Sequence, residues 1–466
     1  MQPDHDTILA PATAAGGALA VIRISGQNAF IICDRIFRGR IPLADTQGYT
    51  VHYGHIVDGE RIVDDVLATV FRAPHSYTGE NSVELSCHGS SYIVSEILRL
   101  LLAAGGRMAT PGEFTLRAYF AGKLDLSQAE AVADLIASSS QAAHTLASNQ
   151  MRGGYSAALD ALRERLLHLA SMLELELDFS EEDVEFADRS ELQKTMEQID
   201  REIERLRSSF ALGNAIKEGV PVAIVGAPNA GKSTLLNRLL NEERAIVSEI
   251  AGTTRDIIEE TINIEGIRFR FVDTAGIRTT DDRLERMGIE RTLQRIAQAR
   301  IIVRVLDSQT IADRSSDCKN CNTIVSEQNF IPAPDFEIPQ DAALITVVNK
   351  IDLHSDITLP QSIIGLSAQN GQGLDTLRNA LLQAAEAKKL NQDDIVVSNS
   401  RHLEALTAAH KALVLALQGL NEGLPTDLLS EEIRQVIFHI GEITGRGVIL
   451  SDEILQNIFS RFCIGK

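Results

Sequence analysis

Residues 226–233 read Gly-Ala-Pro-Asn-Ala-Gly-Lys-Ser, and this stretch decides the fold of the middle of the chain. It matches the pattern GxxxxGK[ST], follows the apolar run Val222 to Val225 and precedes Thr234 to Leu240, which has helical apolar spacing. A strand, a glycine-rich turn and a helix in this order form a phosphate-binding loop. The predicted binding residues of this loop are Asn229, Ala230, Gly231, Lys232, Ser233 and Thr234.

The residue types of this loop suit phosphate chemistry. Its glycines let backbone N–H groups face a phosphate, and the start of the helix adds positive potential. Lys232 is predicted to reach the β- and γ-phosphates of a nucleotide, and the Ser233 hydroxyl is predicted to bind Mg²⁺.

Short apolar runs alternate with helical sequence around the loop. Such runs predict buried parallel strands, and they lie at residues 222–225, 269–273, 301–307, 344–349 and 363–367. The central part is therefore expected to be a Ras-like P-loop α/β domain.

Three further motifs follow predicted strands and identify the nucleotide. Asp273-Thr274-Ala275-Gly276 offers a carboxylate that holds the metal through water and a glycine that senses the γ-phosphate. In Asn349-Lys350-Ile351-Asp352, the Asp352 carboxylate accepts hydrogen bonds from N1 and the exocyclic amine of guanine, which adenine does not offer. Ser367-Ala368 completes a guanine pocket. The set predicts GTP binding and disfavours an ATPase.

Two details indicate the kind of GTPase. Ile277 follows the Asp-Thr-Ala-Gly motif, where Ras-type enzymes have the glutamine that orients the attacking water. Gly252-Thr253-Thr254-Arg255-Asp256 supplies Thr254 to Mg²⁺ and the γ-phosphate from a switch loop. Water positioning is therefore expected to come from another residue.

The sequence on both sides of the α/β region differs from it. Residues 1–121 read as an α+β domain, with strands at 17–24, 61–71 and 81–86 and a helix at 92–104. Leucines at helical spacing then mark long helices at 122–218 and again at 387–466. The sequence therefore predicts a multidomain protein in which one helical bundle is interrupted by an inserted α/β domain at 219–386.

The composition of the chain disfavours several classes of protein. The 466 residues carry a formal net charge of −20, so binding of nucleic acid through bulk charge alone is disfavoured. No apolar run is long enough for a membrane span, no signal peptide is visible, and five scattered cysteines are unlike a disulfide framework. These features predict a cytosolic, cytoplasmic protein with no membrane partner.

Residues 308–341 form a polar stretch without periodicity, which predicts a surface loop. It contains Cys318 and Cys321, but no second Cys or His pair lies near them in sequence, so a plain exposed loop is favoured over a metal site.

The chain resembles the MnmE (TrmE) family of tRNA modification GTPases over essentially its whole length. The motifs that carry the resemblance lie in every predicted domain: Ala20-Val21-Ile22-Arg23-Ile24-Ser25-Gly26, Val83-Glu84-Leu85 with His88-Gly89, Pro111-Gly112-Glu113-Phe114, Gly122-Lys123-Leu124-Asp125-Leu126, Gly252 to Asp256, and the terminal Phe462-Cys463-Ile464-Gly465-Lys466. The terminal motif is the most specific. The loop at 308–341 is longer and richer in cysteine than the family pattern requires.

The resemblance implies a folate site in the N-terminal domain. Arg23, Glu84 and Lys123, with Lys466, would bind 5-formyl- or 5,10-methylene-tetrahydrofolate, and Cys463 would lie near its one-carbon unit as a candidate catalytic nucleophile. Cationic side chains suit the folate carboxylates, and a carboxylate suits the donor edge of the pterin. Without the resemblance, each of these charges reads as a surface charge or an ion pair, and Cys463 reads equally as a packed small hydrophobe.

The resemblance also implies a K⁺ ion beside the nucleotide. The Asn229 side chain would bind K⁺, and the backbone carbonyl groups of Ser248, Ile250 and Thr253 would be the other ligands of the ion. These carbonyl groups belong to the switch loop, whose predicted binding residues are Ser248, Glu249, Ile250, Ala251, Gly252, Thr253 and Thr254. The cation would stabilise charge that develops between the phosphates. Glu285 would orient the hydrolytic water, although its charged surroundings also suit an exposed helix residue.

The resemblance therefore implies a homodimeric, K⁺- and Mg²⁺-dependent GTPase. With an FAD-containing partner of the GidA (MnmG) type, in a heterotetramer, it would add an aminomethyl-type group (carboxymethylaminomethyl) to C5 of wobble uridine 34 in certain tRNAs. GTP hydrolysis would close and reopen paired GTPase domains, and the helical domain would relay the motion. Two alternatives stay open: a ribosome-assembly GTPase of the Era or EngA class, and a pure switch without a role in chemistry.

Overall fold

The structure of the chain is a computed structural model that describes residues 6–14, 16–178, 189–244, 260–271, 299–311, 338–339, 342–354, 359–385, 395–447, 451–460, 462 and 465. Its contacts divide the chain into two compact units. One unit comprises Met1–Ala137, Ala147–Glu204 and Glu404–Lys466, and the other comprises Ser138–Leu146 and Arg205–Leu403. The four domain ranges drawn from the sequence stay predictions.

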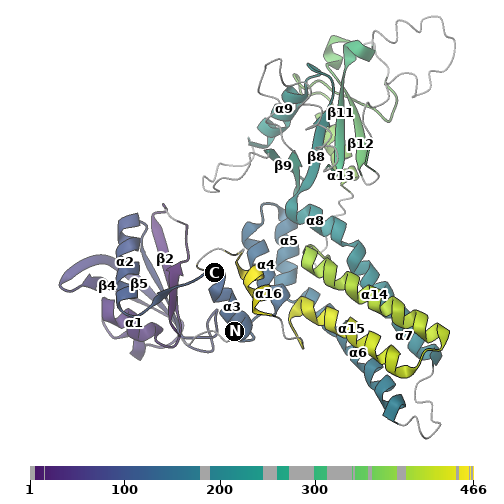
Figure 1. Ribbon diagram of the computed structural model, residues 1–466. Coiled ribbons are helices and arrows are strands. Elements are labelled where there is room, and N and C mark those ends of the chain that lie inside the picture. The colour runs from purple at the N-terminus through teal and green to yellow at the C-terminus, as the bar shows by residue number, and fades with distance from the viewer. Residues whose placement is uncertain are drawn as a thin grey trace, which may run out of the picture. The chain divides into compact units, whose positions relative to one another are not determined.

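The N-terminal part of the first unit is built on a seven-stranded sheet with the order β3-β4-β5-β6-β2-β1-β7 (Figure 1). Neighbouring strands are antiparallel except β1 and β7, which are parallel. The strands are β1 (Ile8–Pro11), β2 (Leu19–Ser25), β3 (Phe37–Gly39), β4 (Thr50–Asp58), β5 (Arg61–Phe71), β6 (Ser82–His88) and β7 (Arg107–Met108).

One face of this sheet packs against helices α1 (Ala29–Ile36) and α2 (Ser91–Ala103). Side chains alternate between the two faces of a strand, so Ile22 and Ile24 of β2 enter the core while Arg23 lies on the opposite face. Glu84 is the register partner of Arg23 on β6. The antiparallel register therefore sets these two predicted site residues side by side.

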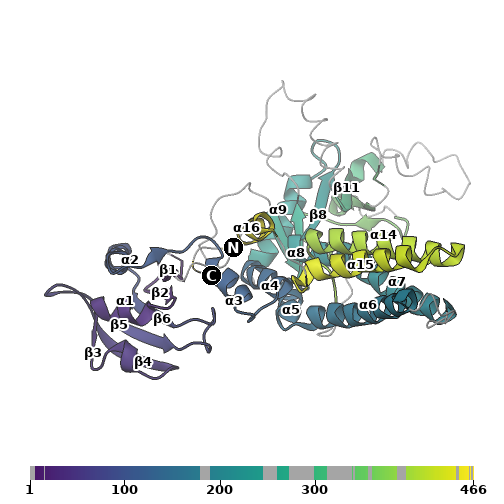
Figure 2. The same ribbon diagram turned by 60° about the horizontal axis from the view of Figure 1, so that its bottom comes forward.

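Long helices form the rest of the first unit. They are α3 (Glu113–Phe120), α4 (Leu126–Ala137), α6 (Gly154–Asp178), α7 (Arg189–Ser208), α14 (Ser400–Glu422), α15 (Thr426–Thr444) and α16 (Asp452–Phe459). Three helices each have residues in both units: α5 (Gln141–Met151), α7 and α14. Helix α15 packs along α6 (Figure 1 and Figure 2). No described helix is long and apolar enough to cross a membrane.

The predicted helical faces are confirmed. Leu162, Leu166 and Leu169 of α6 are buried, whereas Leu167, next in sequence to Leu166, is 39% exposed. Segments on both sides of the α/β region thus join in one bundle, which confirms a helical domain interrupted by an insert.

The second unit contains a six-stranded sheet with the order β13-β12-β11-β8-β10-β9. All neighbouring pairs are parallel except β9 with β10. Its elements are α8 (Phe210–Glu218), β8 (Val220–Val225), α9 (Lys232–Arg244), β9 (Glu260–Ile264), β10 (Ile267–Phe271), β11 (Ile301–Asp307), β12 (Ala343–Asn349), β13 (Ile364–Gly365) and α13 (Leu374–Ala384).

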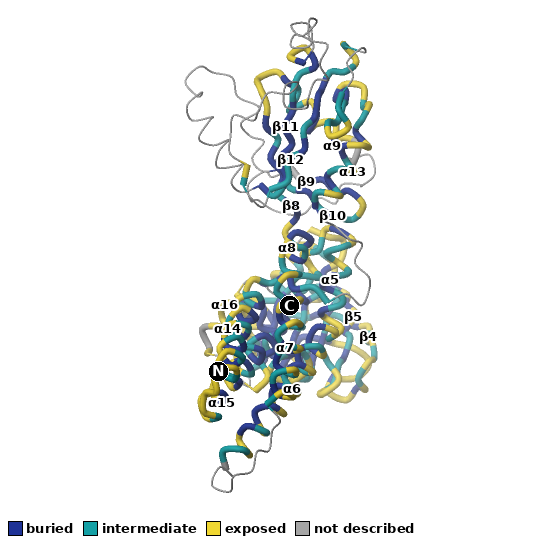
Figure 3. Tube along the Cα trace, turned by 90° about the vertical axis from the view of Figure 1, so that its right-hand side faces the viewer, coloured by how far each residue is buried: buried dark blue, intermediate teal, exposed yellow. Residues whose placement is uncertain are grey.

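The central strands of this sheet are buried on both faces, as the dark blue segments of Figure 3 show. Ile301, Ile302 and Val303 of β11 are each at most 1% exposed. Strands covered on both faces carry continuous apolar runs, which explains why the parallel strands were predicted correctly. The antiparallel β9 was missed because its sequence, ETINI, alternates polar and apolar residues.

Candidate functional site

The phosphate-binding loop joins the end of β8 to the start of α9, as predicted. Three of its residues have positive φ angles: Gly226 at 154°, Asn229 at 64° and Gly231 at 93°. A Cβ atom added to Gly226 would lie 2.2 Å from the Val305 carbonyl oxygen, and one added to Gly231 would lie 2.1 Å from Asn349 Nδ2. Both glycines are therefore required by conformation and by close approach.

The Lys232 ammonium group lies against the carbonyls of the same loop. Its Nζ donates hydrogen bonds to the carbonyl oxygens of Gly226 and Ala227, each at 2.7 Å. Burial lowers the pKa of Lys232, because desolvation disfavours the charged form. Ser233 is partly buried and Thr234 is exposed in the first turn of α9, where free backbone N–H groups favour an anion.

Asn349 joins two loops of the site through one buried side chain. Its Nδ2 donates to the Ala230 carbonyl at 2.9 Å, and its Oδ1 accepts from the Ala368 backbone N–H at 3.0 Å. The residue is 2% exposed. The structure thus gives Asn349 a bridging role between the phosphate-binding loop and the Ser367-Ala368 segment, which the sequence alone did not reveal.

The remaining members of the predicted guanine pocket follow the carboxyl ends of β12 and β13. Lys350 has a φ of 65° and its Nζ pairs with Asp307 Oδ2 at 2.6 Å. Asp352 is exposed in the short 3-10 helix Ile351–Leu353, and the buried Ser367 hydroxyl accepts from the Asn370 backbone N–H at 3.2 Å.

Asp307 is a site residue that sequence reasoning missed. Burial acts to raise the pKa of Asp307, but hydrogen bonds from Lys350 and from the Gln309 backbone outweigh it, so this pKa is lowered. The available signal was its place as the last residue of the predicted strand 301–307.

Arg23 and Glu84 form an ion pair on the open face of the N-terminal sheet, in which two guanidinium nitrogens share one carboxylate oxygen. Arg23 Nε and Nη2 lie 2.9 and 2.8 Å from Glu84 Oε1. Arg23 Nη1 donates to the Gly465 carbonyl at 3.4 Å, so the C-terminal tail reaches this strand. The guanidinium carbon is 5.3 Å from the ring centroid of Tyr77 and 5.7 Å from that of Phe114.

Lys123 lies on the loop that follows α3 and is exposed. A Cβ atom built on Gly79 would be 3.6 Å from Lys123 Cε. The loop that contacts Arg23 through Tyr77 therefore also passes near Lys123 at Gly79. The structure brings Arg23 and Glu84 together and sets Lys123 beside the same loop.

Comparison with known proteins places the whole chain in one family. Residues 7–123 match the family described as "GTP-binding protein TrmE N-terminus", and residues 126–463 match "MnmE helical domain". The chain is 51% identical to the tRNA modification GTPase MnmE of Bacteroides thetaiotaomicron, over 99% of this chain and 100% of that protein. The chain belongs to the MnmE family of tRNA modification GTPases.

A second relative and a solved structure are also similar to the chain. The MnmE protein of Cytophaga hutchinsonii is 50% identical, over 99% of this chain and 98% of that one. Among solved structures, a point variant of Aquifex aeolicus Era bound to GDP.AlF4- is 31% identical, over 42% of this chain and 67% of that one, with a TM-score of 0.23. Such a limited likeness adds nothing to the MnmE assignment.

Several predicted MnmE site residues lie outside the described part of the chain. They are Ser248, Glu249, Ile250, Ala251, Gly252, Thr253, Thr254, Asp273, Thr274, Ala275, Gly276, Glu285, Cys463 and Lys466, together with Cys318 and Cys321. Among the described residues, no group of three His, Cys, Asp or Glu side chains is placed to hold a metal ion. The two described cysteines, Cys33 and Cys87, are buried free thiols, and burial raises the pKa of Cys87 to about 11.

The bridging role of Asn349 predicts the effect of its removal. Asn349→Ala leaves the Ala230 carbonyl and the Ala368 N–H without their partner, and each such loss costs about 1–3 kcal/mol. We expect the affinity for GDP to fall by at least about tenfold, measured by titration with a fluorescent guanine nucleotide. Asn379→Ala, at an exposed asparagine of α13 in the same domain, is the matched control. Equal affinities for the two variants would contradict the bridge.

Proposed function

We propose that this chain couples GTP hydrolysis to the modification of tRNA, adding with a partner an aminomethyl-type group to C5 of wobble uridine 34. Membership of the MnmE family makes the chain a GTPase with a role in tRNA modification. The proposal that the chain binds GTP is supported above all by the hydrogen bonds of Asn349, which join the phosphate-binding loop to the predicted base pocket.

The nucleotide site fits GTP with two cations. The Ser233 hydroxyl, in the first turn of α9, is the expected Mg²⁺ ligand, and Thr254 and Asp273 would complete that site. Asn229 is exposed at a φ of 64° in the phosphate-binding loop, and its amide oxygen is a suitable ligand for a hard cation such as K⁺. K⁺ would supply positive charge near the β- and γ-phosphates. Lys232 would bind the phosphates, and Glu285 would orient the water.

The N-terminal site fits a tetrahydrofolate one-carbon carrier. The Arg23 guanidinium is fixed by Glu84 through two of its nitrogens, so its outer N–H groups have a set direction. Lys123 is an exposed second cation beside the same loop. Cationic groups of this kind suit the carrier's carboxylates. Lys466 and Cys463 flank Gly465, whose carbonyl accepts from Arg23, which supports a role of the terminal motif in this site.

The open face of the N-terminal sheet supports self-association. Val51 and Tyr53 of β4 and Leu67 of β5 are 59%, 60% and 47% exposed, and Tyr53 and Leu67 are register partners. Exposed apolar side chains grouped on one face are typical of protein interfaces. We assign this face to a homodimer. An FAD-containing partner of the GidA (MnmG) type would join it in a heterotetramer and, given the net charge of −20, supply much of the contact with tRNA phosphates.

The dimer proposal predicts the effect of a charge in this patch. Tyr53→Asp places a carboxylate where apolar surface would be buried, so we expect a monomer in sedimentation velocity where the wild type is a dimer. Ile31→Asp, at a 55% exposed position on α1, should leave the dimer intact. A dimeric Tyr53→Asp variant would rule out this face.

The role in tRNA modification is tested by the nucleosides of cellular tRNA. In cells that lack the gene, mass spectrometry should show loss of the C5-modified wobble uridine. Wild type and Lys194→Ala, an exposed lysine of α7, should restore it, whereas Lys232→Ala should not, because the phosphates lose their ammonium partner. An unchanged nucleoside profile would instead favour a ribosome-assembly GTPase of the Era or EngA class.

The assignment of Glu285 separates binding from hydrolysis. Glu285→Ala should bind GTP as tightly as the wild type but hydrolyse it about a hundredfold more slowly or worse, because the water loses its orienting group. Phosphate release under single-turnover conditions measures this rate. Glu290→Ala, in the same charged stretch, is the control, and normal hydrolysis by Glu285→Ala would refute the assignment.

A further inference from the structure

We infer that Arg117 is a positioning residue of the proposed one-carbon carrier site: it fixes the loop of residues 76–80, and through Tyr77 of that loop it holds Arg23 in its binding orientation. The inference rests on the proposed function of this site.

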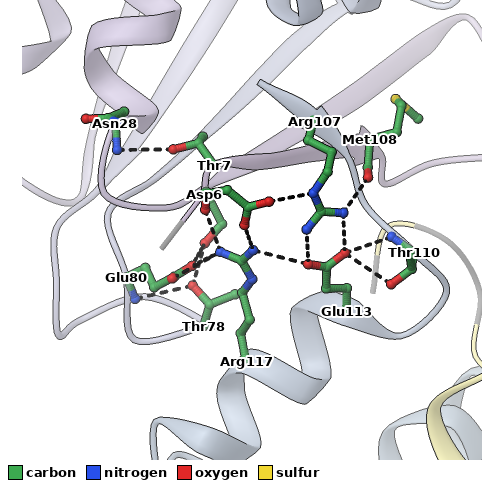
Figure 4. A network of polar contacts seen from close by, with 11 residues as sticks. Asp6, Thr7, Asn28, Thr78, Glu80, Arg107, Met108, Thr110, Glu113 and Arg117 are labelled. Carbon is green, nitrogen blue, oxygen red and sulfur yellow. Dashed lines mark hydrogen bonds and ion pairs between the residues drawn. The ribbon is translucent and has the colours of Figure 1, made fainter. Parts of the chain in front are cut away.

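Arg117 is the buried centre of a network of charged side chains, shown in Figure 4. Its side chain is 2% exposed and projects from α3. Nη1 donates to both carboxylate oxygens of Glu80, each at 3.2 Å, and to the Asp6 carbonyl at 2.9 Å. Nη2 donates to Asp6 Oδ1 at 2.5 Å and to Glu113 Oε1 at 3.1 Å. One guanidinium thus holds three carboxylates that come from separate segments of the chain.

The nearby arginines favour the ionised form of the Asp6 and Glu113 carboxyl groups. Burial acts to raise the pKa of Asp6 and of Glu113, but hydrogen bonds from the nearby arginines outweigh it and lower both values. Arg107 supplies a second cation, 2.6 Å from Glu113 Oε1. Ionised carboxylates make the strong form of the hydrogen bond with a guanidinium, so the buried Arg117 side chain anchors Asp6 and Glu113 firmly.

Glu80 connects Arg117 to the 76–80 loop and to β2 through hydrogen bonds. Its Oε2 accepts from the Ser25 hydroxyl at 2.8 Å, and Ser25 Oγ lies 2.6 Å from Thr78 Oγ1. Within the loop, the Ser76 hydroxyl donates to the Glu80 carbonyl at 2.5 Å. The loop is closed on itself and tied to the last residue of β2, the strand that carries Arg23.

Tyr77 is the part of the loop that meets Arg23. Its ring centroid is 5.3 Å from the Arg23 guanidinium carbon, within the range of a cation–π contact. Its hydroxyl lies 2.9 Å from Thr115 Oγ1 on α3. Burial raises the pKa of Tyr77, so the hydroxyl stays neutral at physiological pH. Displacement of the loop would remove the Tyr77 ring from Arg23 and leave Glu84, the Phe114 ring and the Gly465 carbonyl as its contacts.

A neutral replacement of Glu80 tests the inference in the full-length protein. Glu80→Gln keeps the shape of the side chain but removes its charge-assisted bonds to Arg117. We expect the dissociation constant for 5-formyl-tetrahydrofolate, measured by calorimetry, to rise by about tenfold or more. Glu96→Gln is the matched control, because Glu96 also accepts from two arginines, Arg61 and Arg99. It should bind within about twofold of the wild type, and thermal melting should show both variants folded.

A double-mutant cycle separates positioning from general structural support. Arg23→Lys should weaken binding, and adding Glu80→Gln to Arg23→Lys should weaken it little further, because Glu80 acts through Arg23. Fully additive losses would overturn the positioning role, as would wild-type affinity in Glu80→Gln.

The controls also distinguish this inference from the proposed function. If Arg23→Lys weakens binding and Glu80→Gln does not, the carrier site stands and the inference is wrong. If the wild type does not bind 5-formyl-tetrahydrofolate, the proposed site and the inference are both wrong. Hydrogen exchange gives a readout without ligand: the peptide spanning residues 76–80 should exchange faster in Glu80→Gln, and unchanged exchange would contradict the anchor.

Discussion

The packing of α15 along α6 is the constraint on which the architecture depends. The two helices are separated in sequence by the whole α/β region, yet their apolar faces bury each other, with an ion pair between Arg434 and Glu174 at 2.7 Å. His410 of α14 and Asp200 of α7 approach to 3.3 Å, so the chain leaves this bundle and re-enters it at neighbouring points. Helices α7 and α14 thus both run from this bundle into the second unit, which contains the phosphate-binding loop.

The C-terminal tail also belongs to the first unit. After α15 and α16 the C-terminal tail reaches Arg23 through the Gly465 carbonyl. Gly465 has a φ of 99°, and a Cβ atom there would lie 2.1 Å from the Pro11 carbonyl oxygen. Only glycine fits this position without displacement, which gives the terminal motif Cys-Ile-Gly-Lys a physical reason beyond resemblance.

A site was easier to predict from the sequence when its residues lie close together along the chain. The strand, turn and helix around the phosphate-binding loop were predicted because they are contiguous in sequence, and β11 was predicted with the correct bounds from its apolar run. Arg23 and Glu84 were assigned to one site only from the family resemblance, and their ion pair was not predicted, because it depends on the β2–β6 register. The Arg117 network and the Asn349 bridge were not predicted, since Arg117 and Asp6 are 111 residues apart and Asn349 and Ala230 are 119 apart. No periodic pattern encodes such contacts.

The two linking side chains differ in charge for a physical reason. Asn349 lies beside a loop built for phosphates, and a neutral amide both donates to Ala230 and accepts from Ala368. An aspartate could not donate and would repel the nucleotide, and a lysine could not accept. Arg117 lies among three carboxylates close to a site proposed to bind an anionic carrier. Without its charge, those carboxylates would oppose the attraction that Arg23 and Lys123 exert on the carrier. A buried cation at this position therefore orients the site and also keeps its electrostatic potential favourable for the carrier.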